Sequence, residues 1–214
     1  MTGISAGGIA DRFILSLTGA DHERHPYDHW LLTGCLPETA VQAIRDLPFP
    51  APTDLPFDGR RESANSTRVF FSPEQQRRFP ICAALADAFS SAAVLQTLAL
   101  AAGIPLDHGR LRIEYCQDVD GFWLEPHLDI AVKLFTLLIY LSDDPRLADA
   151  GTDIYAGEEH RLVKTVPYRA NTGLLFLPGQ SSWHGFSKRP ISGIRQSIII
   201  NYVAPAWRAA EELS

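Results

Sequence analysis

The chain has 214 residues, of which 46% are hydrophobic, and a formal net charge of −6 from 19 Lys and Arg against 25 Asp and Glu. This length and this hydrophobic share predict one globular domain over residues 1–214. The basic residues form no run longer than a pair such as Arg77-Arg78, which disfavours a nucleic-acid-binding protein.

Segments that direct a chain to a membrane or out of the cell are not evident. Residues 1–17 lack the basic n-region of a signal peptide. The apolar stretch 130–141 is interrupted by Lys133 and is shorter than the roughly 20 residues that a membrane span needs. The three cysteines lie far apart and form no CxxC pair. We therefore expect a soluble, cytoplasmic protein with reduced thiols and without membrane or nucleic-acid partners.

Helix signals occur in the first 110 residues. Residues 37–47 begin with Pro-Glu, which places proline at the first helical position and a carboxylate in the first turn. A capping-box pattern opens a second helical region over 72–102, in pieces, before Gly103. A stretch rich in proline and polar residues, 48–66, lies between these regions, and a predicted strand, 67–71, follows it. We expect residues 1–110 to form helical and loop support and a lid over the substrate.

Eight short β-type runs follow residue 110, and pairs such as Asp120-Gly121 and Pro178-Gly179 separate them. The predicted strands cover residues 111–117, 126–132, 133–141, 152–156, 162–166, 173–177, 182–186 and 195–203. Short strands with turns between them indicate a jelly roll or barrel rather than a parallel α/β sheet. The predicted fold is thus mainly β, with supporting N-terminal α-helices.

A candidate metal site lies in the β-rich half. His127 and Asp129 are separated by one residue within the predicted strand 126–132, so both side chains point to the same face. One imidazole and one carboxylate are two-thirds of the facial triad of a non-haem Fe(II) oxygenase. His184, on the predicted strand 182–186, is placed to supply the second imidazole. The alternative is a pair of core imidazoles and a turn carboxylate.

A candidate anion site lies eleven residues after His184. Arg195 and Ser197 share one face of the last predicted strand. A guanidinium fork binds a carboxylate bidentately and a hydroxyl adds a third hydrogen bond, which suits the end of a dicarboxylate. Arg195 on the surface of an edge strand is the alternative, but it precedes the apolar run 198–200, where a charge usually needs a buried partner.

With these residues the sequence resembles the Fe(II)/2-oxoglutarate-dependent dioxygenases over residues 111–203. Enzymes of this family carry HxD, a second His and an Arg about ten residues on, and their fold is the double-stranded β-helix, a jelly roll of the cupin-like type. Finer details resemble the prolyl-hydroxylase-like branch: Tyr115 and Gly121-Phe122 before the HxD, Tyr140-Leu141, Gly173-Leu-Leu-Phe176 and Trp183-His184-Gly185. Two features depart from that branch. Gly151-Thr152 replaces the usual Gly-Gly, and Arg-x-Ser is more typical of other branches.

The resemblance implies a role for each matched residue. It implies that iron is bound by His127, Asp129 and His184, that Arg195 anchors the distal carboxylate of 2-oxoglutarate with help from Tyr140 and Ser197, and that Tyr115 faces the cofactor pocket. Fe(II), the co-substrate 2-oxoglutarate and O₂ are the implied cofactors, and stimulation by ascorbate is compatible with them. The implied reaction converts 2-oxoglutarate and O₂ to succinate and CO₂ while an unactivated C–H of a small molecule is hydroxylated. Asp129 separates the chain from the related halogenases, which have a small residue there.

Other functions stay open at this point. Desaturation or demethylation would use the same site, and a protein or peptide side chain, as in prolyl hydroxylation, is the alternative substrate. A non-redox metal-binding module of the cupin type is the alternative from another class, although Arg195-x-Ser197 speaks against it. The substrate and the oligomeric state do not follow from the sequence.

A second histidine cluster competes as a metal site. His22, His25 and His29 lie among acidic residues, but they lack an i, i+4 helical pair and Pro26 interrupts any helix. We expect a solvated loop there.

Several further side chains have two interpretations. Tyr115 and Tyr140 are equally suited to the core of a sheet. Trp123 and Trp183 are expected to pack in the core, with a wall of the substrate pocket as the alternative. Lys133 has the opposite parity to Thr136 on its predicted strand, so we expect it to face outward. Three arginines in or beside the proline-rich stretch, Arg60, Arg61 and Arg68, are surface residues or a clamp for an anionic substrate.

Overall fold

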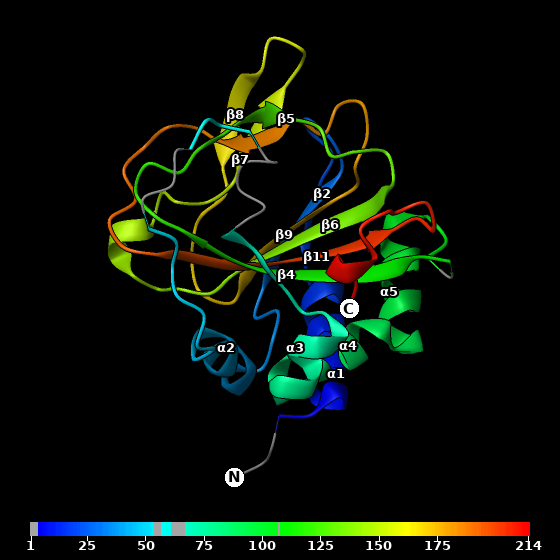
Figure 1. Ribbon diagram of the computed structural model, residues 1–214. Helices are drawn as coiled ribbons and strands as arrows, with labels where there is room; N and C mark the ends of the chain where they lie inside the picture. Colours follow the sequence, from blue (N-terminus) through cyan, green and yellow to red (C-terminus); the bar gives the residue numbers. More distant parts are fainter. Residues whose placement is uncertain (1–3, 54–56, 61–66, 107) are drawn as a thin grey trace.

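The computed structural model describes residues 4–53, 57–60, 67–106 and 108–214. Two antiparallel sheets lie face to face, and helices cover the outer face of the larger sheet (Figure 1). This arrangement confirms the predicted fold class, mainly β with supporting helices. Arg61 falls outside the described residues, as do residues 54–56 and 62–66 of the proline-rich stretch 48–66.

The large sheet has seven strands in the order β1-β2-β9-β6-β11-β4-β3, and the small sheet has four in the order β5-β10-β7-β8. The strands are β1 Asp21–Glu23, β2 His29–Thr33, β3 Val69–Phe70, β4 Arg110–Asp118, β5 Leu124–His127, β6 Lys133–Tyr140, β7 Asp153–Ala156, β8 Arg161–Thr165, β9 Thr172–Phe176, β10 His184–Phe186 and β11 Arg195–Val203. All eight strands predicted after residue 110 are present. The second, predicted over 126–132, is displaced: β5 covers Leu124–His127 and shares only residues 126 and 127 with the prediction.

Within the described residues, the α-helices and 3₁₀ helices that accompany the sheets are α1 Ala6–Thr18, α2 Glu38–Arg45, α3 Pro73–Arg78, α4 Pro80–Ser90, α5 Ala92–Ala102, η2 Pro145–Leu147 and η3 Ala210–Glu212. The predicted helix over 37–47 and the helical pieces over 72–102 are confirmed. Helix α1 was not predicted; its buried side chains pack against α4 and α5.

Strand alternation gives the large sheet two different faces. Ile113, Ile198 and Ile200 point toward the helices and join the larger hydrophobic core. Ser197 and Asp118 point the other way, toward the small sheet. The residues buried on the helix side are mainly apolar, and their removal from water stabilises the fold. The space between the sheets contains a smaller hydrophobic cluster and a cavity lined in part by polar residues.

The first half of the chain also contributes strands. β2 pairs with β9, and β3 pairs with β4, so both edges of the large sheet come from residues before 71. The expectation of a solvated loop around the histidine cluster was wrong for His29. This side chain is fully buried on β2, and its ring Nδ1–H donates to the carbonyl of Tyr27. His22 lies on β1, where its ring stacks on Trp30.

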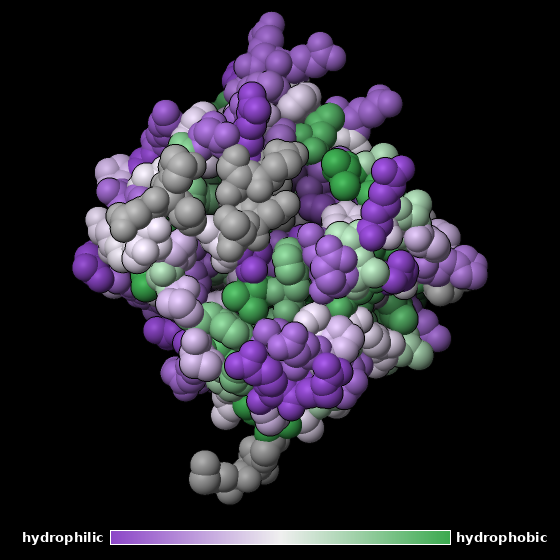
Figure 2. Space-filling view, in the orientation of Figure 1, coloured by the Kyte–Doolittle hydropathy of each residue, from purple (hydrophilic) through white to green (hydrophobic). Residues whose placement is uncertain are grey.

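Hydrophilic side chains dominate the periphery of the face seen in Figure 2, and hydrophobic ones gather nearer its centre. Among the described residues, no single helix is long and apolar enough to cross a membrane. The pair α4 and α5, bent by 55° at their junction, meets that criterion only when the two are taken together.

Candidate active site

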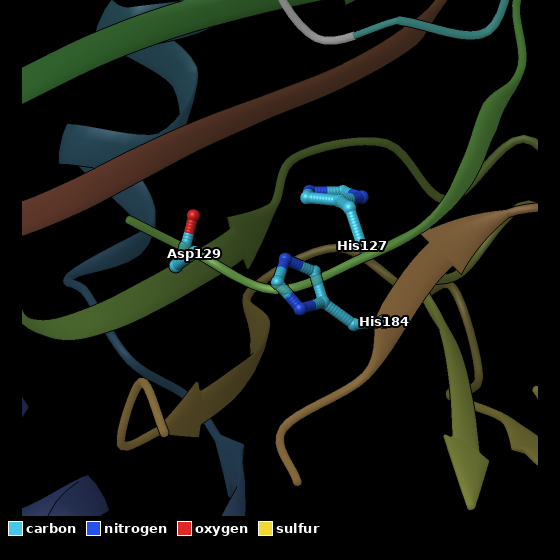
Figure 3. A group of neighbouring side chains, drawn as sticks. All are labelled: His127, Asp129 and His184. Carbon is cyan, nitrogen blue, oxygen red and sulfur yellow. The ribbon is translucent and has the colours of Figure 1, made fainter. Parts of the chain in front are cut away.

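The three predicted metal ligands come together between the sheets. His127 ends β5, Asp129 lies in the loop that follows, and His184 begins β10 (Figure 3). His127 and His184 are direct partners in the antiparallel pair β5–β10, and their ring centroids lie 4.3 Å apart. One ligand atom from each of the three residues lies within 4.8 Å of the others, so the group can hold a metal ion. The prediction that Asp129 and His127 share one face of a strand is therefore wrong. Asp129 approaches His127 through the loop that follows β5.

Backbone carbonyls orient both imidazoles. The Nδ1 of His127 lies 2.9 Å from the carbonyl oxygen of Glu125, and the Nδ1 of His184 lies 2.9 Å from that of Ser182. In each ring Nδ1–H is thus the donor, which puts the lone pair on Nε2, the atom a metal would use. Burial lowers the pKa of His184 to about 3, with His127 acting in the same direction. The imidazole of His184 is accordingly neutral, as a metal ligand must be.

The carboxylate of Asp129 is held at both oxygens. Lys133 Nζ donates to Oδ1 at 2.5 Å, and the hydroxyl of Thr136 donates to Oδ2 at 2.6 Å. Burial alone would raise the pKa of Asp129, but the charge of Lys133 and the hydrogen bonds from Lys133 and Thr136 lower it below its ordinary value. Asp129 is therefore a carboxylate, ready to bind a cation.

The inward position of Lys133 corrects the prediction that it faces outward. The β6–β11 register pairs Phe135 with Tyr202 but Lys133 with Val203, so one residue of β6 is skipped. Such a bulge reverses the alternation of side chains at the start of the strand. Lys133 and Thr136 thus line the same cavity between the sheets, although they lie three residues apart on the strand.

A buried polar chain leads from the candidate metal site to the C-terminus. The amide of Asn201 donates to the hydroxyl of Thr136 at 2.9 Å and accepts from Arg112 at 3.1 Å. Arg112 in turn pairs with Glu114 and, at 2.7 Å, with Glu212 of η3. The hydroxyl that binds Asp129 is itself held in place by this chain, because each polar group in it has a partner.

The candidate anion site lies in the same cavity. Arg195 is buried, its Nε donates to the carbonyl of Ala150 at 2.6 Å, and its NH1 pairs with Asp118 at 2.5 Å. Ser197 is fully buried, and its hydroxyl has no hydrogen-bond partner among the described residues. The buried partner that Arg195 was expected to need is Asp118, which was not predicted. Only the register Arg195–Asp118 of the β4–β11 pair reveals it.

The two tyrosines differ in position. Tyr140 is fully buried next to Arg195, whose guanidinium carbon lies 5.7 Å from the ring centroid, and its hydroxyl donates to the hydroxyl of Thr152 at 2.8 Å. Its help to Arg195 stays a prediction. Tyr115 lies on the helix side of β4, packs against Phe49 and accepts a hydrogen bond from Gln196. The prediction that Tyr115 faces the cofactor pocket is therefore corrected: its parity on β4 is opposite to that of Asp118.

The three arginines of the proline-rich region also separate. Arg68 is buried and binds the second oxygen of Asp118, from NH1 to Oδ1 at 2.8 Å. Arg60 is exposed. Trp123 and Trp183 are half-buried, and Trp183 packs against the ring of His160.

Two adjoining cavities meet at the candidate metal site. The first has an empty volume of about 540 Å³, counted with its opening to solvent, and contains the candidate anion site. The second, of about 950 Å³ counted in the same way, is bounded by Arg112, Glu125, Ile130 and Trp207. His127, Asp129 and Lys133 border both. A group bound in the first cavity and a molecule in the second would thus both reach His127 and Asp129, whereas His184 borders the first cavity alone.

Comparison with solved structures identifies the fold. A prolyl-4-hydroxylase from Pseudomonas putida superposes with a TM-score of 0.61 at 16% identity, over 92% of this chain and 100% of that one. A prolyl hydroxylase from Trichoplax adhaerens, solved with a peptide fragment of the hypoxia-inducible factor oxygen degradation domain, gives 0.58 at 17%, over 92% and 90%. AviO1 from Streptomyces viridochromogenes Tue57 gives 0.55 at 15%, over 98% and 100%. No protein-family model and no curated protein sequence matches the chain.

The chain therefore has the double-stranded β-helix fold of the prolyl hydroxylases, as the resemblance over residues 111–203 predicted. At these identities the likeness concerns the fold, and function has to be argued from the site.

Proposed function

We propose that the protein is a non-haem Fe(II)- and 2-oxoglutarate-dependent dioxygenase that hydroxylates an unactivated C–H bond of a small-molecule substrate. The observation that carries this proposal is that one cavity holds both a two-histidine, one-carboxylate group and a buried arginine–serine pair. The first suits iron with open coordination positions, and the second suits a dicarboxylate. A metal-binding module without redox chemistry would have no use for the second.

The residues present fit both groups. The donor set of two imidazoles and one carboxylate is that of the facial triad. The hydroxyl of Ser197 is buried without a partner among the described residues, which is costly unless a bound molecule supplies one. Its place beside Arg195 fits a carboxylate of 2-oxoglutarate.

When bound, iron and 2-oxoglutarate supply the oxidising chemistry, in which 2-oxoglutarate and O₂ become succinate and CO₂. The protein's own residues bind and orient. His127 and His184 present Nε2 because their Nδ1–H groups donate to the backbone. Thr136 holds the carboxylate of Asp129 in place, and Asp118 holds the guanidinium of Arg195. The second cavity, which His127 and Asp129 also border, is the proposed place of the substrate.

Anaerobic titration tests the proposal. The wild-type protein with Fe(II) is expected to develop a weak visible charge-transfer band when 2-oxoglutarate is added. Asp129→Ala is expected to lose metal binding, whereas Arg195→Gln should keep Mn(II) binding and lose 2-oxoglutarate binding. Asp144→Asn, a change in a solvent-exposed pair, is the matched control. Absence of the band in the wild type, or an undiminished band in both site variants, would overturn the proposal.

A peptide side chain is the second candidate substrate, because one structural neighbour was solved with a peptide fragment bound. Incubation with Fe(II), 2-oxoglutarate and either a proline-containing peptide library or a metabolite extract separates the two, with incorporation of one oxygen atom measured by mass spectrometry. Oxygen incorporation into peptides alone would replace the small-molecule proposal with the peptide one.

A further inference from the structure

Arg68 belongs to the wall of the first cavity although it comes from the other half of the chain. It directly precedes β3, and β3 runs antiparallel to β4 with Val69 opposite Tyr115. This register brings Arg68 to the side of β4 that carries Asp118, where 2% of its side chain is exposed. Its guanidinium lies 5.5 Å from the ring centroid of Phe122.

The hydrogen bonds of Arg68 are incomplete. Its NH1 binds Asp118 at 2.8 Å, but its Nε–H is buried and has no partner among the described residues. The hydroxyl of Ser197, which borders the same cavity, is also buried and unpaired there. Buried donors without partners are costly. Two of them at one cavity indicate a bound group that supplies acceptor atoms.

The charges around Asp118 indicate the sign of that group. One carboxylate serves two buried guanidinium groups, since Arg68 binds Oδ1 and Arg195 binds Oδ2. The cluster therefore has a formal charge of +1. The other charged pair at this cavity, Lys133 with Asp129, is balanced within itself. Buried charge needs compensation, so the group that completes the cluster is an anion.

We propose that Arg68 is a second arginine for the distal carboxylate of 2-oxoglutarate and binds it together with Arg195 and Ser197. This inference rests on the proposed function. It adds a residue from outside the β-rich half to the co-substrate site and makes the site more selective for dicarboxylates. A 2-oxo acid without a distal carboxylate, such as pyruvate, has nothing to place against Arg68.

The test measures binding of 2-oxoglutarate and of pyruvate to the Mn(II)-loaded protein by calorimetry. Arg68→Gln is expected to raise the Kd of 2-oxoglutarate about ten- to hundredfold, the effect of losing a hydrogen bond between charged groups. The Kd values of pyruvate and of Mn(II) should stay as in the wild type. Arg68→Lys, which keeps a cation beside Asp118, is expected to lie between the wild type and Arg68→Gln. Arg78→Gln, which removes an exposed guanidinium on α3, is the matched control.

Comparison of the two acids distinguishes a role of Arg68 in binding the distal carboxylate from a role in folding. If Arg68 serves only to hold the structure, Arg68→Gln weakens both acids in the same proportion, and the inference is overturned. An unchanged Kd of 2-oxoglutarate in Arg68→Gln, with normal binding by the wild type, overturns it as well and leaves the proposed function intact. A wild-type protein that binds Mn(II) but no 2-oxoglutarate overturns both. Should Arg68→Gln not fold, Arg68→Lys gives the same comparison.

Discussion

Asp118 should be among the most important single side chains for the stability of this fold. It is 1% exposed and is the ionic partner of two guanidinium groups that are themselves 2% and 6% exposed at the side chain. Asp118→Asn keeps the shape of the side chain and removes its charge. Both arginines then stay buried with a neutral amide in place of their counter-ion. Removal of one partner from a buried ion pair costs about 3–5 kcal/mol, because the other charge is left without compensation.

This cost can be measured in urea. The four tryptophans give a fluorescence signal for unfolding, and the free energy of unfolding of a domain is typically about 5–15 kcal/mol. We expect Asp118→Asn to lower it by about 3–5 kcal/mol with an unchanged slope against urea. Glu74→Gln, which neutralises one member of the exposed Glu74–Arg78 pair, should leave the urea midpoint unchanged.

A double variant separates charge from packing. In the Asp118→Asn background, Arg68→Met removes one of the two uncompensated cations. The double variant is therefore expected to be more stable than Asp118→Asn alone, although Arg68→Met destabilises the wild-type protein. A loss of less than about 1 kcal/mol in Asp118→Asn would refute this reasoning, since a surface ion pair costs no more. Additive losses in the double variant would show that packing, and not charge, is responsible.

Three further predictions concern other parts of the site and the fold. Thr136→Val removes the hydroxyl that binds Asp129 and is expected to weaken Mn(II) binding about 10- to 100-fold in a calorimetric titration, and an unchanged Kd would contradict this. Gly151→Ala would place a Cβ only 1.5 Å from the carbonyl oxygen of Val166, so we expect a loss of about 3 kcal/mol or more in urea unfolding, and a variant as stable as the wild type would show that the backbone yields there. The pKa of Asp153 lies below its ordinary value because hydrogen bonds from an arginine, a serine and a threonine outweigh the effect of burial, which alone would raise it. Its contribution to stability is therefore complete above the ordinary pKa, near about 4, and is lost as the pH falls toward the folded-state value. The stability difference between wild type and Asp153→Asn should shrink in acid, and a difference independent of pH would contradict the assignment.

The strands after residue 110 were predictable because their signals are local. Apolar runs between turn residues carry the information in a few neighbouring residues, and β11 begins and ends where the sequence predicted. The three residues of the candidate metal site could also be picked out in the sequence, because the chemistry of a metal site restricts residue type more strongly than fold does.

What the sequence did not show depends on pairing between distant segments. β2 is short and follows a charged stretch with Pro26, and its pairing with β9, more than 130 residues later, joins it to the large sheet. Lys133 faces inward because of a bulge in the pairing of β6 with β11. Asp118 matters because of its register with Arg195. In each case the local sequence is compatible with several structures, and tertiary contacts select one.

The same dependence changes the interpretation of the first 110 residues. They were expected to support and cover a catalytic core. They also supply the two edge strands of the large sheet, β1 and β3, and β2 next to β1. The β3–β4 pair brings Arg68 to Asp118, and Asp118 holds Arg195. A charge from the first half of the chain and a charge from the last strand thus share one carboxylate. If Arg68 binds 2-oxoglutarate as proposed, substitutions in the N-terminal half that displace it weaken co-substrate binding. The comparison of 2-oxoglutarate with pyruvate binding in Arg68→Gln decides whether Arg68 has this role.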